Sequence, residues 1–144
     1  MVAYQPSRSP CPIGRAARVI GDRWAILILR EAMLEVETFA VFQKRLAIPR
    51  AALVSRLRWL TEAGVIERVP PEGRRAAYKL TPAGRDLFTT MTALRQWGDR
   101  WLFGPEHEPK TLPTRHGEPV APVEVRTVGG MPVAFEDRLI PGNG

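Results

Sequence analysis

The segment from Ile48 to Thr81 restricts the fold more than any other part of this 144-residue chain. Its first half, "RAALVSRLRWLTEAG", begins after Pro49 and ends at Gly64, which is placed for a left-handed cap. These two boundaries predict a helix. Its second half, "VIERVPPEGRRAAYKLT", holds two short apolar runs around a Pro-Pro-Glu-Gly turn, a pattern typical of a β-hairpin. The chain must therefore fold so that a hairpin follows directly on a helix.

This predicted helix has two different faces. At 100° per residue, Leu53, Leu57 and Leu60 fall on one stripe. The opposite side carries small and charged residues, namely Ala51, Ser55, Arg58 and Glu62. One face therefore belongs to the core, and the other faces outward.

Helical patterns also lie before and after this segment. The stretch "IGRAARVIGDRWAILILREAML" predicts two helices broken near Gly21-Asp22, with Asp22 capping the second. Thr38 is placed to cap a short third helix, "FAVFQKRLA". After the hairpin, Thr81 is placed to cap one long helix, "PAGRDLFTTMTALRQWGDRWLF", whose apolar stripe requires a partner surface.

The composition changes after Gly104. Seven of the 14 prolines lie in the last 40 residues, where only "VEVRTVGGMPVAFEDRLI" alternates like strands. We expect a flexible linker to about Pro113 and then a small β element, which has too few apolar residues for its own core and must dock elsewhere. The predicted domains are therefore residues 11–103 and a tail, residues 104–144.

The net charge of +6 is concentrated in the front of the chain. Residues 1–104 hold 17 basic and 9 acidic residues, a net charge of +8, whereas residues 105–144 hold 4 and 6, a net charge of −2. Such a basic region favours polyanions. No apolar run approaches the roughly 18 residues of a membrane span, and the first ten residues lack the apolar centre of a signal peptide. We therefore expect a cytoplasmic protein without a membrane partner.

The order of the elements predicts an α+β fold, a winged helix-turn-helix with a two- to three-stranded β-wing and a C-terminal extension. A recognition helix fits the major groove of double-stranded DNA, and the wing sets Arg74 and Arg75 against phosphates or into the minor groove. Gly73 supplies the permissive backbone of the turn. The alternative for the two arginines is a solvated hairpin tip.

Individual positions on the recognition helix differ in their expected roles. Arg50 and Ser55 can approach base edges, whereas Arg58 can equally contact phosphates, which carry no sequence information. Arg56 flanks the core and either contacts DNA or pairs with an acidic neighbour. Trp59 projects nearly opposite the leucines, so we expect it to pack against the wing or the preceding helix.

Four sequence pieces carry a resemblance to a known family: "CPIGRAARVIGDRWAILILREAM", "FAVFQKRLAIPRAALVSRLRWLTEAGVIERV", "YKLTPAGRDL" and "QWGDRW". In this order they resemble the HxlR-type winged-helix regulators of bacteria and archaea, from Cys11 to Leu102. The resemblance implies a homodimer that binds a pseudo-palindromic operator, with its first and last helices at the dimer interface, and we expect repression. The expected DNA-binding residues are Arg50, Ala51, Ser55, Arg56, Arg58, Arg74 and Arg75. The expected dimer contacts are Ile13, Leu94, Trp97 and Trp101.

The single cysteine, Cys11, excludes an internal disulfide. It precedes Pro12 at a helix start between Arg8 and Arg15, where a thiolate is favoured. Some members of the resembling family are thiol-based sensors with a cysteine at this position, so Cys11 is a candidate redox sensor. The alternative role for Cys11 is that of a small buried apolar group. The alternative signal for the regulator is a small-molecule effector.

The segment from Arg115 to Gly144 resembles a C-terminal extension that, in some family members, is similar to a zinc ribbon with paired cysteines, but here it has no cysteine. His107 and His116 stand in the tail without a third ligand, so we expect both to be solvated and no metal to bind. The sequence lacks a phosphate-binding loop and a nucleophile elbow, so we expect neither catalysis nor a cofactor. The rival function is a winged helix that binds another protein.

Overall fold

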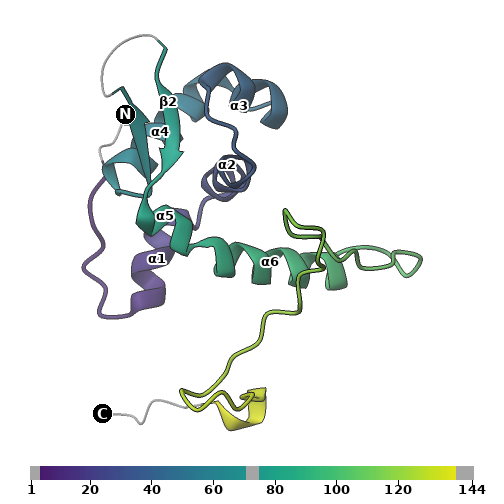
Figure 1. Cartoon of the computed structure of the whole chain (residues 1–144). Helices are drawn as coiled ribbons and strands as arrows, with labels where there is room; N and C mark the ends of the chain where they lie inside the picture. Colours follow the sequence, from purple (N-terminus) through teal and green to yellow (C-terminus); the bar gives the residue numbers. More distant parts are fainter. Residues whose placement is uncertain (1–3, 71–74, 139–144) are drawn as a thin grey trace. The chain divides into compact units, whose positions relative to one another are not determined.

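The computed structural model describes residues 4–70 and 75–138. The elements are α1 (Pro12–Ile20), α2 (Arg23–Met33), α3 (Phe39–Leu46), α4 (Arg50–Glu62), β1 (Ile66–Val69), β2 (Ala77–Leu80), α5 (Pro82–Asp86), α6 (Phe88–Trp101) and the 3-10 helix η1 (Phe135–Asp137) (Figure 1). They form two compact units, Met1–Phe88 and Thr89–Gly144, and α6 falls almost wholly in the second. The predicted boundary at residues 103 and 104 stays a prediction.

Helix α2 is the centre of the first unit, because it packs against α1, α3, α4 and β2. Figure 1 shows α2, α3 and α4 gathered beside the hairpin. The buried apolar core consists of Ala25, Ile28, Leu29, Val36, Phe42, Ile48, Leu53, Leu57, Leu60, Val65 and Ile66. The predicted leucine stripe of α4 is thus part of this core, and the α+β prediction is confirmed.

The predicted helix ends agree with the backbone. Asp22 caps α2, since its carboxylate accepts hydrogen bonds from the N–H groups of Trp24 (2.9 Å) and Ala25 (3.2 Å). Gly64 has a φ of 74°, the left-handed conformation expected after α4. Thr38 occupies the N-cap position of α3, but its side chain makes no capping hydrogen bond.

The wing consists of β1 and β2 paired in antiparallel register, with Arg68 opposite Tyr78. The segment before α3 extends this pair, because the N–H of Tyr78 donates to the carbonyl of Glu37 (2.7 Å) and Thr38 forms a bridge with Ala77. A wing of two strands and a third bridged segment confirms the prediction. Gly73 and Arg74 lie outside the described residues.

The predicted single long helix after the hairpin is wrong, because the chain ends α5 at Asp86 and starts α6 at Phe88. The cap itself is confirmed: the Thr81 hydroxyl accepts a hydrogen bond from the N–H of Gly84 (3.1 Å). A Cβ added to Gly84 would lie 2.1 Å from the Val65 carbonyl oxygen. This close approach fixes α5 beside the start of the wing, and the helical pattern alone does not reveal it.

The tail is attached to one side of α6 within the second unit. Asp99 accepts hydrogen bonds from the Lys110 N–H (2.6 Å) and pairs with His107 Nε2 (2.9 Å), whose ring stacks on Phe103 with 4.2 Å between centroids. Gln96 exchanges hydrogen bonds with the backbone at residues 121 and 123. The prediction of a solvated His107 is therefore wrong, because α6 offers its ring a polar partner at Asp99, whereas the flexible linker stays a prediction.

The predicted β element of the tail is reduced to two similar turns, "LPTRHGEPV" (112–120) and "VRTVGGMPV" (125–133). In each turn a threonine hydroxyl accepts from the N–H four residues later, and a glycine has a positive φ. Isolated bridges join Pro113 to Pro119 and Arg126 to Pro132. Proline cannot donate to a strand ladder, which explains why these bridges do not extend into strands.

Candidate nucleic-acid interface

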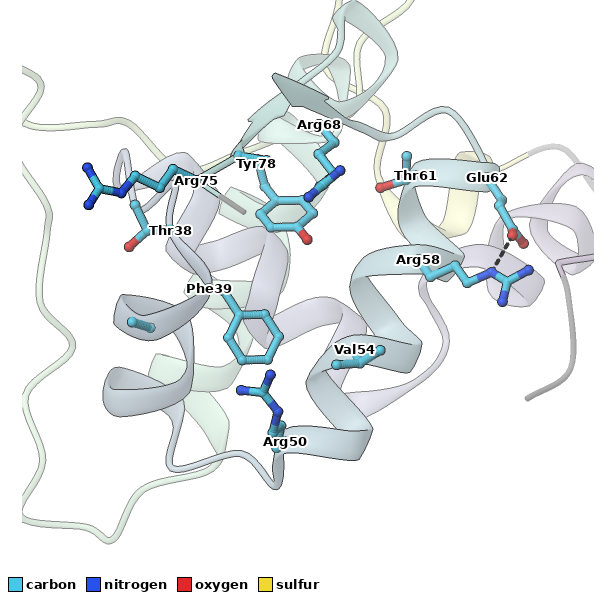
Figure 2. Close-up of a pocket in the computed structure, with 12 residues that line it drawn as sticks. Thr38, Phe39, Arg50, Val54, Arg58, Thr61, Glu62, Arg68, Arg75 and Tyr78 are labelled. Carbon is cyan, nitrogen blue, oxygen red and sulfur yellow. Dashed lines mark hydrogen bonds and ion pairs between the residues drawn. The ribbon is translucent and has the colours of Figure 1, made fainter. Parts of the chain in front are cut away.

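An open hollow of about 920 Å³ lies between the outer side of α4, the start of α3 and the wing (Figure 2). Its lining residues are Thr38, Phe39, Ala40, Arg50, Val54, Arg58, Thr61, Glu62, Arg68, Arg75, Ala76 and Tyr78. We call this hollow the arginine groove. Four of its lining residues are arginines and one is a glutamate, so its formal charge is positive and suits an anionic partner.

Arg50 stands at the start of α4 and at the lower edge of the groove in Figure 2. Its guanidinium lies 5.0 Å from the centroid of the Phe39 ring, within the range of a cation–π contact. This contact orients the charged group beside α3 while the residue stays exposed. The structure therefore brings Arg50 together with Arg58 and Arg75, three of the seven residues expected to bind DNA.

Arg58 reaches the groove together with a carboxylate partner. Its Nε donates to Glu62 Oε1 over 2.6 Å, and the second oxygen of Glu62 accepts the N–H of Tyr4 over 2.8 Å. The Arg58 hydrogen bond, followed by that from Tyr4, holds the pKa of Glu62 below its usual value. Glu62 stays ionised at neutral pH and competes with any phosphate for the Arg58 guanidinium.

Arg56 takes the second of its two predicted roles in this structure, because it pairs with an acidic neighbour inside the first unit. Its Nε and one terminal nitrogen donate to the two oxygens of Asp22 over 2.9 and 3.2 Å. Burial alone would raise the pKa of Asp22, but the hydrogen bonds from Arg56, Ala25 and Trp24 outweigh burial and lower it. Arg56 does not line the groove, and its contact with DNA stays a prediction.

The other two predicted residues of α4 lie beside the groove and not in its lining. Ala51 is exposed in the first turn, and Ser55 is half-buried one turn later. A small exposed residue such as Ala51 lets a DNA backbone or base edge approach the helix closely. Their DNA contacts stay predictions, and Arg74 lies outside the described residues.

Trp59 has partners that the sequence did not predict, and its expected packing against the wing or the preceding helix stays a prediction. Its ring meets the edge of the Tyr4 ring at a centroid distance of 4.8 Å, and the guanidinium of Arg18 lies 5.1 Å from its centroid. The N-terminal segment and α1 thus contribute to covering this side of α4. A non-periodic segment gives no sequence signal for such a contact.

Nine of the twelve lining residues were not among the predicted site residues, and Val54, Arg68 and Tyr78 are three of them. Arg68 and Tyr78 are cross-strand partners, so their side chains share one face of the wing. Val54 follows Arg50 by four residues, the spacing that places two side chains on one side of a helix. Spacing from Arg50 would have found Val54, whereas Arg68 and Tyr78 depend on the strand register, which the turn sequence alone does not fix.

Cys11 is the N-cap residue of α1 and is exposed with an unbridged thiol. The alternative of a small buried group is therefore wrong. Its backbone is held in the turn, since its N–H donates to the Ser9 hydroxyl and its carbonyl accepts from the Arg15 N–H, each over 3.1 Å. This arrangement leaves the thiol open to reagents in the surrounding solvent.

Apolar side chains are exposed at all four positions expected in the dimer interface: Ile13 (78%), Leu94 (43%), Trp97 (53%) and Trp101 (64%). No described residue of α6 is buried. Among the described residues, no three histidine, cysteine, aspartate or glutamate side chains come close enough to hold a metal ion. No helix of this part of the chain is both long and apolar enough to cross a membrane.

Known proteins resemble the chain in sequence and in structure. The HTH-type transcriptional regulator Rv3095 of Mycobacterium tuberculosis is 48% identical over 102 residues, which are 69% of this chain and 65% of that relative. The chain thus matches slightly less than two thirds of the relative's length. PA1607, described as a candidate transcription factor, is 39% identical with a TM-score of 0.85, covering 94% of this chain and 97% of its own.

A third similar protein is the redox regulator HypR in its oxidized form, which is 28% identical with a TM-score of 0.52 over 61% of this chain and 94% of its own. The HxlR-like helix-turn-helix family matches residues 19–106, a span that contains α2 to α6 and the whole arginine groove. The match confirms the resemblance expected from the four sequence pieces. This chain belongs to the HxlR-like helix-turn-helix family.

Proposed function

We propose that this protein is a transcriptional regulator that binds double-stranded DNA through the arginine groove. The observation that carries the proposal is the gathering of Arg50, Arg58, Arg68 and Arg75 around the outer side of α4. An α-helix such as α4 fits the major groove, and the flanking wing would reach the phosphates beside it. The similarity to proteins named HTH-type transcriptional regulators supports this function.

The proposed active form is a homodimer. On α6 the side chains of Leu94, Trp97 and Trp101 project to one side at 100° per residue, whereas Gln96 and Asp99 project to the other. The tail is hydrogen-bonded to Gln96 and Asp99, so it leaves the tryptophan side uncovered. A second copy would cover this apolar stripe and, with Ile13, would place two α4 helices about 34 Å apart on a pseudo-palindromic operator.

Fluorescence anisotropy with a labelled duplex from the gene's upstream region tests DNA binding, with a scrambled duplex as reference. We expect at least about a hundredfold preference for the upstream duplex and a steep loss of affinity with salt, because bound phosphates release counterions. Arg75→Ala should lower the salt slope by about 1 on every sequence. The matched control is Arg85→Ala, which removes an exposed arginine of α5 outside the groove lining. This variant should leave the salt slope unchanged.

The rival function is a winged helix that binds another protein and uses its basic surface for solubility. Equal, weak and salt-insensitive binding to both duplexes would favour this rival. The proposed sign of regulation is repression in the cytoplasm: a reporter behind the upstream region should gain expression when the gene is deleted. A loss of expression would instead identify an activator.

A thiol response is a second proposal, carried by the exposed Cys11 at the start of α1. The similarity to the redox regulator HypR supports it. Diamide should change the DNA affinity of the wild-type protein and leave the Cys11→Ser variant unaffected. An identical response of both proteins would contradict the proposal and would direct the search for a signal to small-molecule effectors.

A further inference from the structure

Val54 is an exposed apolar residue that lies between two arginines on the outer side of α4. It is 38% exposed and lines the arginine groove, between Arg50 and Arg58 along the same helix. Figure 2 shows Val54 beside the hollow that Phe39 and Tyr78 also border. The leucine stripe of α4 is buried without it, so the core does not explain why a valine stands here.

The spacing places Val54 one helical turn from an arginine on either side. Arg50, Val54 and Arg58 are separated by four residues each, which is about 6 Å of rise along the helix axis. If the two arginines contact phosphates or guanine edges, Val54 faces the base edges between them. The exposed Ala51 nearby has too small a side chain to hold α4 away from the bases.

The major groove offers one apolar group to such a side chain, the C5-methyl of thymine. Guanine, adenine and cytosine present acceptors and donors at their major-groove edges, which a valine would leave without partners. A valine in a helix is also held in one preferred rotamer, so its two methyl groups form a fixed surface. We propose that Val54 selects a thymine in each half-site by packing against the thymine methyl. This inference rests on the proposed function of DNA binding.

The experiment removes the proposed methyl contact first from the DNA and then from the protein. Each thymine of the bound upstream duplex is replaced in turn by deoxyuridine, which keeps the pairing and lacks only the methyl group. Wild-type protein should lose about fourfold affinity at one thymine of each half-site, the value of one buried methyl group. The Val54→Ala variant should bind the uridine and thymine duplexes equally at that position.

The control is Val41→Ala, which shortens a similarly exposed valine on α3 outside the groove lining. It should keep the wild-type sensitivity to uridine. Because Val54 is exposed and alanine favours helices, we expect Val54→Ala to fold, and its thermal melting should confirm this. Val54→Thr, which retains one of the two methyl groups, should keep part of the discrimination.

The possible failures are distinguishable. If wild-type protein binds the upstream and scrambled duplexes equally, the proposed function of DNA binding is wrong. The thymine contact, which rests on that function, is then wrong as well. If it prefers the upstream duplex but no uridine lowers affinity, or if Val54→Ala keeps the same uridine sensitivity, the thymine contact is wrong. A Val54→Ala variant that loses affinity equally for all duplexes would place Val54 against the sugar–phosphate backbone and would also overturn the contact.

Discussion

Helices α4 and α6 both carry an apolar stripe. Other elements of the chain bury the stripe of α4, whereas the stripe of α6 stays exposed. Leu53, Leu57 and Leu60 of α4 are at most 1% exposed, because α2, α3 and β1 pack against this side. The stripe of α6 stays between 43% exposed at Leu94 and 64% at Trp101. The same pattern thus produces a core helix in one unit and, in the other, a helix whose apolar side stays exposed.

The difference indicates whether folding or association covers the apolar side of each helix. Folding of the first unit fixes α4, so the outward positions of the arginine groove are set before any partner binds. Helix α6 gains no such cover, since the tail attaches to its polar side at Gln96 and Asp99. Its apolar side is therefore available for association, and the next four predictions test this contrast.

The largest effect is expected from Leu57→Ala. Removing a fully buried leucine side chain leaves a cavity that costs about 2–5 kcal/mol in the free energy of unfolding. Denaturant unfolding measured at several protein concentrations checks this value. Leu94→Ala on α6 is the matched control and should change the unfolding free energy mainly where the protein is associated. An equal loss for both variants at every concentration would contradict the contrast.

The second effect is expected from Trp97→Ala on the exposed stripe. A central interface tryptophan contributes about 2 kcal/mol or more to association, so the dimer dissociation constant should rise at least about thirtyfold. Sedimentation equilibrium measures this constant. Phe135→Ala, which removes a 71% exposed aromatic of the tail, is the control and should leave the dimer intact. A Trp97→Ala variant that dimerises like wild type would remove α6 from the interface.

The parts of the fold that sequence predicts are those with local signals. Pro49 and Gly64 mark the ends of α4, and helical periodicity identifies its buried leucines. The break at Leu87 gives no such signal, because the helical pattern continues through it. The close approach of Gly84 to Val65 holds α5 beside the start of the wing, and this contact exists only in the folded chain.

The candidate site follows the same rule. Arg50 and Arg75 are found from their places at a helix start and beside a hairpin turn. Arg68 is missed because its face of the wing depends on the strand register, which the turn alone does not fix. Tyr4 covering Trp59 is missed because it joins distant segments through two aromatic rings, without any repeating pattern that sequence could display.

The third effect concerns Asp22, which caps α2 and anchors Arg56 of α4. Asp22→Ala should cost about 1 kcal/mol through the lost cap. The folded-state pKa of Asp22 lies below its ordinary value of 3.8, so its stabilising contribution is present above that value and disappears as pH falls through the folded pKa. The difference in stability between wild type and variant should therefore shrink on acidification.

Denaturant unfolding between neutral pH and about pH 2.5 measures this difference, with Asp86→Ala as the control for an exposed carboxylate of the same unit. A gap between wild type and Asp22→Ala that widened at low pH would mean that the folded state raises the pKa of Asp22. That result would contradict a charged pairing of Asp22 with Arg56.

The smallest effect is expected from Asp99→Asn, which weakens the contact between α6 and the tail. The hydrogen bonds from His107 and Lys110 lower the pKa of Asp99, so at neutral pH its charge strengthens both bonds, and asparagine lacks that charge. The exposed bond after Lys110 should become several times more sensitive to trypsin, whereas Glu106→Gln should leave its cleavage rate unchanged.

The dissociation constant of the proposed dimer should stay at the wild-type value in Asp99→Asn, because Asp99 lies on the side of α6 opposite the tryptophans. If Asp99→Asn weakened the dimer as strongly as Trp97→Ala, both sides of α6 would belong to the interface. The helix would then be enclosed on association much as α4 is enclosed on folding.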